Sequence, residues 1–253
     1  MSHREFAPPA ALRESVRCFW HERRAGPARI DVLPDGHPEI VFHAGGPCRM
    51  EDGSPLPSPF VMALLDGPVA LRTDGPLDIL GIRCFPWTVY ELLGLPSGTA
   101  AIDLTAHPIA TLQPTVARAL LDGRVDDAVA ALARHLSAGR VDVDRLLARA
   151  GGAMRDAGGT LPVVRVAAAA HATVRTLERR FKRASGRTVK DVSGLMRFEQ
   201  VRNRLWIDPD ADLAGLAQEY GYADQPHLSR EFKRYSGTTP AAFAQGRREE
   251  NKS

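Results

Sequence analysis

Apolar residues recur along this chain with two different spacings. Over residues 1–105 they form short runs bounded by turn residues such as Pro, Gly or Asp, a pattern typical of antiparallel β-strands. The predicted strands are Val16–Trp20, Ile30–Leu33, Glu39–His43, Phe60–Leu65, Val69–Leu71 and Leu77–Cys84. The spacing becomes helical from Trp87 onward. The pattern therefore predicts an α+β protein whose amino-terminal domain, residues 1–105, is β-rich and barrel-like.

Residues 106–158 carry apolar positions at helical spacing and are predicted to be a helical linker or dimerisation segment. The helices predicted in and just before it are Trp87–Leu93, Pro108–Leu121, Val125–Leu136 and Val141–Ala157. Helices of this length either form a dimer seam or pack back across the β-domain, and both arrangements stay open. The pairs Gly151-Gly152 and Gly158-Gly159 flank a short piece that is predicted to be the hinge to the next domain.

A ten-residue segment occurs twice in the carboxy-terminal part of the chain. Leu177–Gly186 reads LERRFKRASG and Leu228–Gly237 reads LSREFKRYSG, so seven of ten positions are identical at an offset of 51 residues. In each copy, Leu and Phe lie four residues apart on one helical face, while Arg and Lys occupy the other. The repeat therefore predicts one small helical unit that is used twice.

Each copy is predicted to be the second helix of a helix-turn-helix. In the first unit, His171 lies in the turn, Thr173 is the N-cap and Gly186 ends the helix. His171 must adopt a left-handed backbone there, at a cost that glycine avoids.

The second unit has the same plan with different residues at the turn. Gly221 lies in the turn, Asp224 is the N-cap and Gly237 ends the helix. A helix over Val189–Trp206 is predicted between the units. It would hold the two second helices a fixed distance apart, matched to about 34 Å, one turn of duplex DNA.

Charge is distributed unevenly between the two parts of the chain. Residues 160–253 hold 17 Lys and Arg against 11 Asp and Glu, whereas residues 1–159 hold 16 against 19. Residues 160–206 alone hold 11 basic and 3 acidic residues. Such a basic segment favours contact with nucleic-acid phosphates, although solvated helix faces are also basic.

The segment Leu213–Phe243 has the pattern Leu-Ala-x-x-x-Gly-Tyr-x-Asp-Gln-x-His-Leu-x-Arg-x-Phe-Lys-Arg-x-x-Gly-x-x-Pro-x-x-Phe. With this pattern, residues 161–243 resemble the DNA-binding domain of AraC/XylS-type bacterial transcription regulators. His171 stands where such proteins usually carry Gly, and Pro226 where a polar residue is common. The resemblance implies that residues 159–246 form a DNA-binding domain with two helix-turn-helix units, followed by a charged tail, 247–253.

The resemblance also implies partners for the chain. They are double-stranded promoter DNA and a small-molecule effector, with RNA polymerase and a second copy of the chain as further candidates. The segment Leu33–His43 is similar to a stretch in the amino-terminal domains of some of these regulators, which implies a sensing or dimerising β-barrel.

Two sets of exposed side chains are predicted to contact DNA. In the first unit they are Thr173, Arg175, Glu178, Arg179, Lys182 and Arg183. In the second unit they are Gln225, His227, Ser229, Arg230, Lys233 and Arg234. Arg179 suits guanine, Gln225 suits adenine, and Glu178 either accepts from cytosine or pairs with a neighbouring Arg. The Lys and Arg residues late in each helix are predicted to touch phosphates.

Five aromatic residues of the amino-terminal domain are predicted to line an effector pocket or to fill its core. They are Trp20, Phe42, Phe60, Phe85 and Trp87. His37, Glu39 and His43 alternate onto one strand face, but the spacing of metal-binding β-barrels is missing, so neither a metal nor a cofactor is expected. Among the cysteines, Cys48 beside Arg49 is the candidate for a redox or alkyl-accepting thiol, whereas Cys84 suits a core position.

Composition sets the remaining limits. The chain is 44% apolar with a mean hydropathy of −0.21, and no apolar run approaches the roughly 18–20 residues of a membrane span. Its start lacks the order of a secretory signal, and Cys18, Cys48 and Cys84 lack Cys-x-x-Cys spacing. We therefore expect a cytoplasmic regulator that binds without catalysis. A regulator with thiol chemistry and a non-specific architectural DNA binder are the alternatives.

Overall fold

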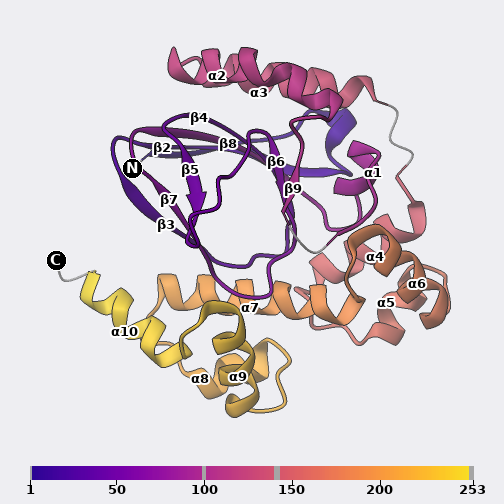
Figure 1. Ribbon diagram of the computed structural model, residues 1–253. Helices are drawn as coiled ribbons and strands as arrows, with labels where there is room; N and C mark the ends of the chain where they lie inside the picture. Colours follow the sequence, from indigo (N-terminus) through magenta and orange to yellow (C-terminus); the bar gives the residue numbers. More distant parts are fainter. Residues whose placement is uncertain (1, 99–100, 140–142, 251–253) are drawn as a thin grey trace.

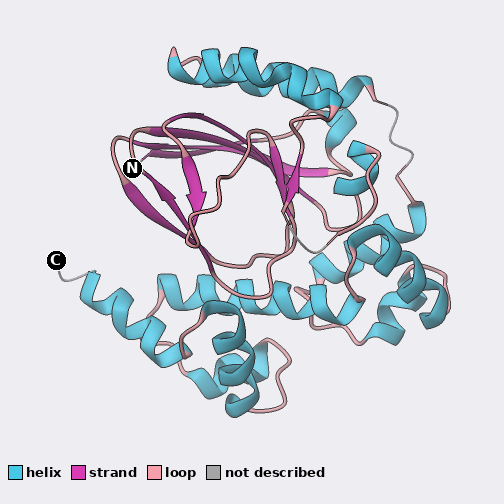
Figure 2. Cartoon of the chain, viewed as in Figure 1, coloured by secondary structure: helices cyan, strands magenta, loops and turns pink. Residues whose placement is uncertain are grey.

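The computed structural model describes residues 2–98, 101–139 and 143–250. A β-domain lies in the middle of the molecule, with helices α2 and α3 along one side and helix α7 along the opposite side (Figure 1). The β-rich amino-terminal part and the all-helical carboxy-terminal part are separate in the chain (Figure 2). The predicted α+β class with this order of domains is confirmed.

The described strands form two antiparallel sheets. The six-stranded sheet has the order β1 (Ser2–Phe6), β2 (Val16–Arg24), β8 (Leu77–Cys84), β4 (Glu39–Gly45), β6 (Phe60–Met62) and β9 (Ile102–Asp103). The three-stranded sheet has the order β3 (Ala28–Val32), β7 (Val69–Thr73) and β5 (Cys48–Met50). All six predicted strands are present within a few residues, whereas β1, β5 and β9 were not predicted.

Side chains of the central strands alternate between two cores. On β4, Ile40 and Phe42 pack toward the helices, while Val41 packs toward the second sheet. On β8, Leu80 and Ile82 lie on the helix side and Ile79 on the other. This is the two-residue period of a strand that is covered on both faces.

The helices that follow the β-domain pack in two different places. The short helices α1 (Val89–Leu93) and η2 (Pro108–Leu112) lead to α2 (Gln113–Leu121) and α3 (Val125–Ala138). Their apolar residues, such as Leu120 and Leu132, are buried against the six-stranded sheet. Of the two arrangements left open by the sequence, the described residues show the helices lying back across the β-domain.

Helix α4 (Arg145–Asp156) belongs to the helical domain, where it packs on α5 and α6. The first two residues of its predicted range, 141–142, lie outside the described residues. The hinge prediction is wrong at Gly151-Gly152, because both residues lie inside α4 and a Cβ on Gly151 would overlap the Trp87 ring. Gly158-Gly159 does connect two helices, but its carbonyls accept hydrogen bonds from Gln200 and Arg197 of α7.

The helical domain continues with α5 (Val163–Ala169), α6 (Val174–Ser185), α7 (Val189–Ile207), α8 (Leu213–Glu219), α9 (Gln225–Ser236) and α10 (Pro240–Glu250). The linking helix predicted over Val189–Trp206 is therefore confirmed. The charged tail was predicted to begin at Arg247, yet residues 247–250 belong to α10. Arg247 stacks over the Trp206 ring, 3.4 Å from its centroid. Residues 251–253 lie outside the described part of the chain.

The two domains share a hydrophobic core. Leu64, Phe85 and Trp87 of the β-domain are buried in the same cluster as the apolar faces of α4, α6 and α7. The Trp87 ring stacks on Phe85 at 5.5 Å and lies 5.9 Å from the ring of Phe181 in α6. No helix among the described residues is long and apolar enough to cross a membrane.

Candidate nucleic-acid interface and effector cavity

Helices α5 and α6 form the first helix-turn-helix. Between them His171 has a φ of +51°, the left-handed conformation expected from the sequence. The Thr173 hydroxyl accepts from the amide of Thr176 at 3.2 Å and so caps α6. Gly186, with a φ of +72°, ends the helix, while Leu177 and Phe181 are fully buried. The predicted cap, anchors and stop are all confirmed.

Helices α8 and α9 form the second unit in the same way. Gly221 occupies the turn with a φ of +69°, which glycine adopts without steric cost. The Asp224 carboxylate accepts from the amide of His227 at 2.6 Å, and Gly237 ends α9. Leu228 and Phe232 anchor the helix in the core. The repeat in the sequence is therefore a repeat in the structure.

Helix α7 connects the two units and is fixed to both. Its 19 residues span about 28 Å at about 1.5 Å per residue, close to the roughly 34 Å turn of duplex DNA. The Val189 amide donates to the Glu178 carboxylate of α6 at 3.4 Å. At the other unit, Arg197 donates to Glu231 of α9 at 3.0 Å. Because both contacts involve side chains of the second helices, α7 sets the separation of α6 and α9.

The exposed side chains of α6 match the prediction with one exception. Arg175, Arg179, Lys182 and Arg183 are exposed, and Thr173 is exposed while it serves as the cap. Glu178 is half-buried, and its contact with the Val189 amide matches neither the cytosine nor the arginine partner considered from the sequence. Glu178 is therefore less exposed than predicted, and its contact with DNA stays a prediction.

On α9, four of the six residues predicted to contact DNA are exposed and two are half-buried. Gln225, Arg230, Lys233 and Arg234 are exposed, but His227 and Ser229 are half-buried. The His227 ring turns back, so that its Nδ1 accepts from the Ala223 amide at 3.3 Å. The same ring packs edge-on against Tyr222 at 5.4 Å. His227 is therefore less exposed than predicted, with 40% of its side chain accessible, because the ring also stabilises the start of its own helix.

An apolar cavity of about 80 Å³ lies between the two sheets of the β-domain. Its lining is almost entirely carbon, with Trp20 and Phe60 among the wall residues. Phe42 lies on the opposite face of the six-stranded sheet, and Phe85 and Trp87 lie in the core shared by the domains. The structure therefore brings together two of the five aromatic residues predicted to line a pocket.

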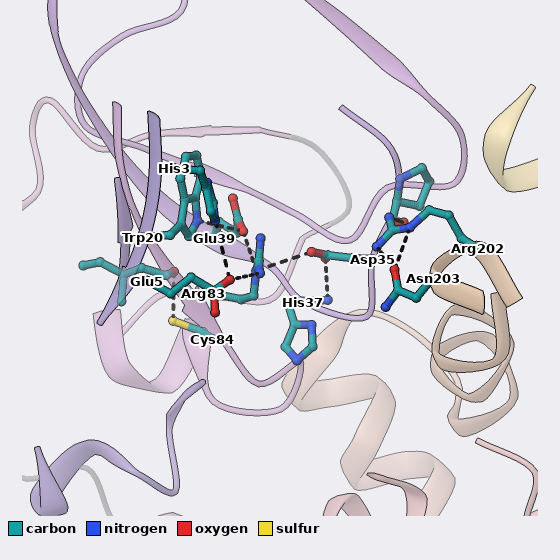
Figure 3. A network of polar contacts seen from close by, with 12 residues as sticks. His3, Glu5, Trp20, Asp35, His37, Glu39, Arg83, Cys84, Arg202 and Asn203 are labelled. Atoms are coloured by element: carbon teal, nitrogen blue, oxygen red, sulfur yellow. Dashed lines mark hydrogen bonds and ion pairs between the residues drawn. The ribbon is translucent and has the colours of Figure 1, made fainter. Parts of the chain in front are cut away.

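A polar network lies at one side of this cavity, where the β-domain faces α7 (Figure 3). The Glu39 carboxylate accepts from the Trp20 indole at 3.0 Å and from the Arg83 guanidinium at 2.8 Å. Burial and the neighbouring Asp35 carboxylate raise the pKa of Glu39 to about 7, against the effect of Arg83. Burial lowers the pKa of His37 to about 4, so this ring is neutral near pH 7.

Helix α7 closes the outer side of the network. Arg202 of α7 donates to the carbonyl of Pro34 at 3.4 Å, beside Asn203 (Figure 3). Glu199, one turn earlier, lines the same space, and its burial raises its pKa. The network therefore contains side chains from both domains.

Metal and thiol chemistry find little support in the described residues. His43 uses its Nε2 on the carbonyls of Leu56 and Pro57. In the described part of the chain, no group of three or more His, Cys, Asp or Glu is arranged to hold a metal. Cys18, Cys48 and Cys84 are buried, and burial raises the pKa of each thiol, that of Cys18 to about 11. Raised pKa values keep these thiols in the unreactive protonated form.

Comparisons with known proteins agree with this division of the chain. Residues 166–246 match a family described as a helix-turn-helix domain, and residues 4–101 match a domain of unknown function (DUF6597). The helix-turn-helix match spans both repeated units. A comparison with curated proteins finds no match.

Several solved structures are similar to this chain. The DNA-binding domain of AdpA, in complex with a target DNA, shares 24% identity over 44% of this chain and 98% of its own, with a TM-score of 0.39. ToxT from Vibrio cholerae shares 8% identity over 90% of this chain and 98% of its own, with a TM-score of 0.47. The C-terminal domain of AraT, a response regulator from Geobacillus stearothermophilus, shares 20% identity over 42% and 88%, with a TM-score of 0.39.

Proposed function

We propose that this chain is a DNA-binding regulator of transcription of the AraC type, and that it reads two successive major-groove faces of promoter DNA under the control of a small molecule. The observation that carries the proposal is the pair of capped second helices held by α7. Because α7 contacts a side chain of each second helix, it holds α6 and α9 at a fixed spacing, as two docking sites one helical turn apart on the same side of a duplex require.

The exposed residues of each second helix divide into two roles. Arg175 and Arg179 of α6, with Gln225 and Arg230 of α9, lie early enough in their helices to reach base edges, Arg179 toward guanine and Gln225 toward adenine. The late residues Lys182, Arg183, Lys233 and Arg234 contact phosphates, which position the protein without reading sequence. Thr173 remains within reach of the backbone as the cap of α6. Glu178 accepts from the Val189 amide and His227 from the Ala223 amide, which stabilises the helices, and Ser229 stays a predicted DNA contact.

The cavity between the sheets is the proposed effector site. Its apolar lining suits a hydrophobic group, and its volume of about 80 Å³ suits the apolar end of a larger molecule. Trp20 and Glu39 line both this cavity and the polar space next to α7, so an occupant would be sensed close to the DNA-binding domain. RNA polymerase and a second copy of the chain stay predictions as partners.

A footprint on the DNA upstream of the gene for this protein and its neighbours tests the proposal. We expect protection of a bounded site that covers two successive turns, because each unit reads one major-groove face. Repeating the footprint with candidate small hydrophobic metabolites should change the occupancy of that site, and Phe60→Trp, which fills the cavity, should remove the response. Even protection of all DNA would instead support a non-specific architectural binder.

A further inference from the structure

The loop that leaves β6 reaches from the β-domain to both helix-turn-helix units. We name residues 64–68, Leu-Leu-Asp-Gly-Pro, the clasp. Its first residue, Leu64, is buried in the core of the helical domain. A Cβ on Gly67 would lie 3.5 Å from the carbonyl oxygen of Arg234, and a Cβ on Gly237 would lie 3.4 Å from the Pro68 ring. The clasp therefore lies directly on the carboxy-terminal end of α9.

One carboxylate of the clasp contacts arginines from both units. Asp66 Oδ2 lies 2.7 Å from Nη1 of Arg187, which follows α6, and Asp66 Oδ1 lies 3.5 Å from Nη2 of Arg234 in α9. Arg187 also donates to the carbonyl of Leu64 at 2.8 Å, so two adjacent positions of the clasp hold it. Asp66 thus joins the two units by charge near the start of α7.

The Arg234 guanidinium is also one of the groups proposed to contact DNA phosphates. It lies in the last turn of α9, where we propose that basic side chains contact DNA phosphates. Carboxylate and phosphate oxygens bind a guanidinium in the same way, so they compete for it. The side chains of Asp66 and Arg234 are 57% and 56% exposed, which leaves their contact open to water and to exchange.

We propose that the clasp is an autoinhibitory contact in which the Asp66 carboxylate occupies Arg234 in place of a DNA phosphate. The negative charge of Asp66 also repels the DNA backbone from the neighbouring surface. Loss of this charge should strengthen DNA binding. The inference rests on DNA binding by the two units and is independent of the effector proposed above.

The test compares Asp66→Asn with Asp74→Asn in the full chain. Asp74 is an exposed acid at the other end of β7, about 16 Å along a strand of five residues, so its substitution removes the same charge from a different place. We expect Asp66→Asn to bind duplex DNA about threefold to tenfold more tightly than the wild type. Its plot of log affinity against log salt should also be steeper by about one. Asp74→Asn should change affinity by less than about twofold.

A second comparison tests whether Asp66 acts through Arg234. If Asp66 acts by occupying this guanidinium, the gain from Asp66→Asn should fall by at least half when Arg234→Ala is present. An equal gain in both backgrounds, no gain beyond that of Asp74→Asn, or weaker binding by Asp66→Asn would each overturn the proposal. Absence of binding by the wild type to any duplex would instead overturn the proposed function, so the two failures are distinguishable.

Discussion

The two helix-turn-helix units share a motif but differ in what surrounds them. The first unit is packed into the core between the domains, where Phe181 of α6 meets Trp87 of the β-domain at 5.9 Å. Arg180 of the same helix pairs with Asp144 before α4 at 2.9 Å. The second unit meets the β-domain through the clasp, with an exposed ion pair at Arg234. The difference teaches that a repeated sequence gives two helices the same caps and core anchors, while the contacts around each helix come from different neighbours.

The largest expected effect is on stability, and it comes from a substitution that disrupts the packing of the first unit against the β-domain. Trp87 is 2% exposed and lies against Gly151, Phe85 and Phe181. Trp87→Ala should lower the free energy of unfolding by about 3–5 kcal/mol, because a large buried ring is lost and a cavity remains. Denaturant unfolding measures this change, with Trp206→Ala as the control. Trp206 is 53% exposed, so its loss should cost about 1 kcal/mol or less.

Hydrogen exchange locates the effect of Trp87→Ala. Amides of α6 should lose more protection than those of α9, because Trp87 touches the first unit. Equal loss in both helices would show that the two units are a single cooperative body, and the contrast between them would not hold.

The second-largest expected effect is on DNA affinity, and it compares the base contacts proposed for the two units. Arg179→Ala should cost about 1–3 kcal/mol on the specific site and flatten the preference at one base position. Arg230→Ala should act at a position one helical turn away. Lys182→Ala is the matched control in the first unit, since it should weaken all sequences alike and reduce the salt slope by about one. Electrophoretic mobility shifts on single-base variants of the site distinguish these outcomes, and equal losses on random DNA for Arg179→Ala and Lys182→Ala would contradict the assigned roles.

The smallest expected effect concerns the two turns. His171 and Gly221 occupy equivalent places with φ values of +51° and +69°. Gly221→Ala should destabilise the protein by about 1 kcal/mol, because alanine is strained in the left-handed region. His171→Gly should relieve strain and change stability by about 0.5 kcal/mol or less, since glycine also has more freedom to lose. Thermal unfolding of both variants gives the signs, and a loss of similar size in both would show that His171 has a contact worth more than its strain.

Local signals predicted the helical domain well. The caps Thr173 and Asp224, the anchors Leu177 and Phe232 and the stop at Gly186 each depend on residues within one or two helical turns. These features appear in the structure at the predicted positions. The same local logic gave six of the described strands, namely β2, β3, β4, β6, β7 and β8.

Side-chain partners from distant parts of the chain could not be predicted. Glu178 and His227 occupy positions that a helical pattern leaves exposed, yet each also accepts from a backbone amide beyond its own helix, Val189 and Ala223 respectively. The strands β1, β5 and β9 are short and are defined by pairing more than by their own pattern. Asp66 lies in a turn-like segment where an acid is unremarkable, and its meaning comes from two arginines more than 120 residues away.

Strand β6 spans only Phe60–Met62, so the chain leaves the cavity wall and enters the clasp within a few residues. Phe60 and Met62 form part of the cavity wall, and Asp66 lies four residues beyond Met62. In extended chain this is about 13 Å. The wall of the cavity is therefore joined by a few residues of chain to the carboxylate that contacts Arg187 and Arg234.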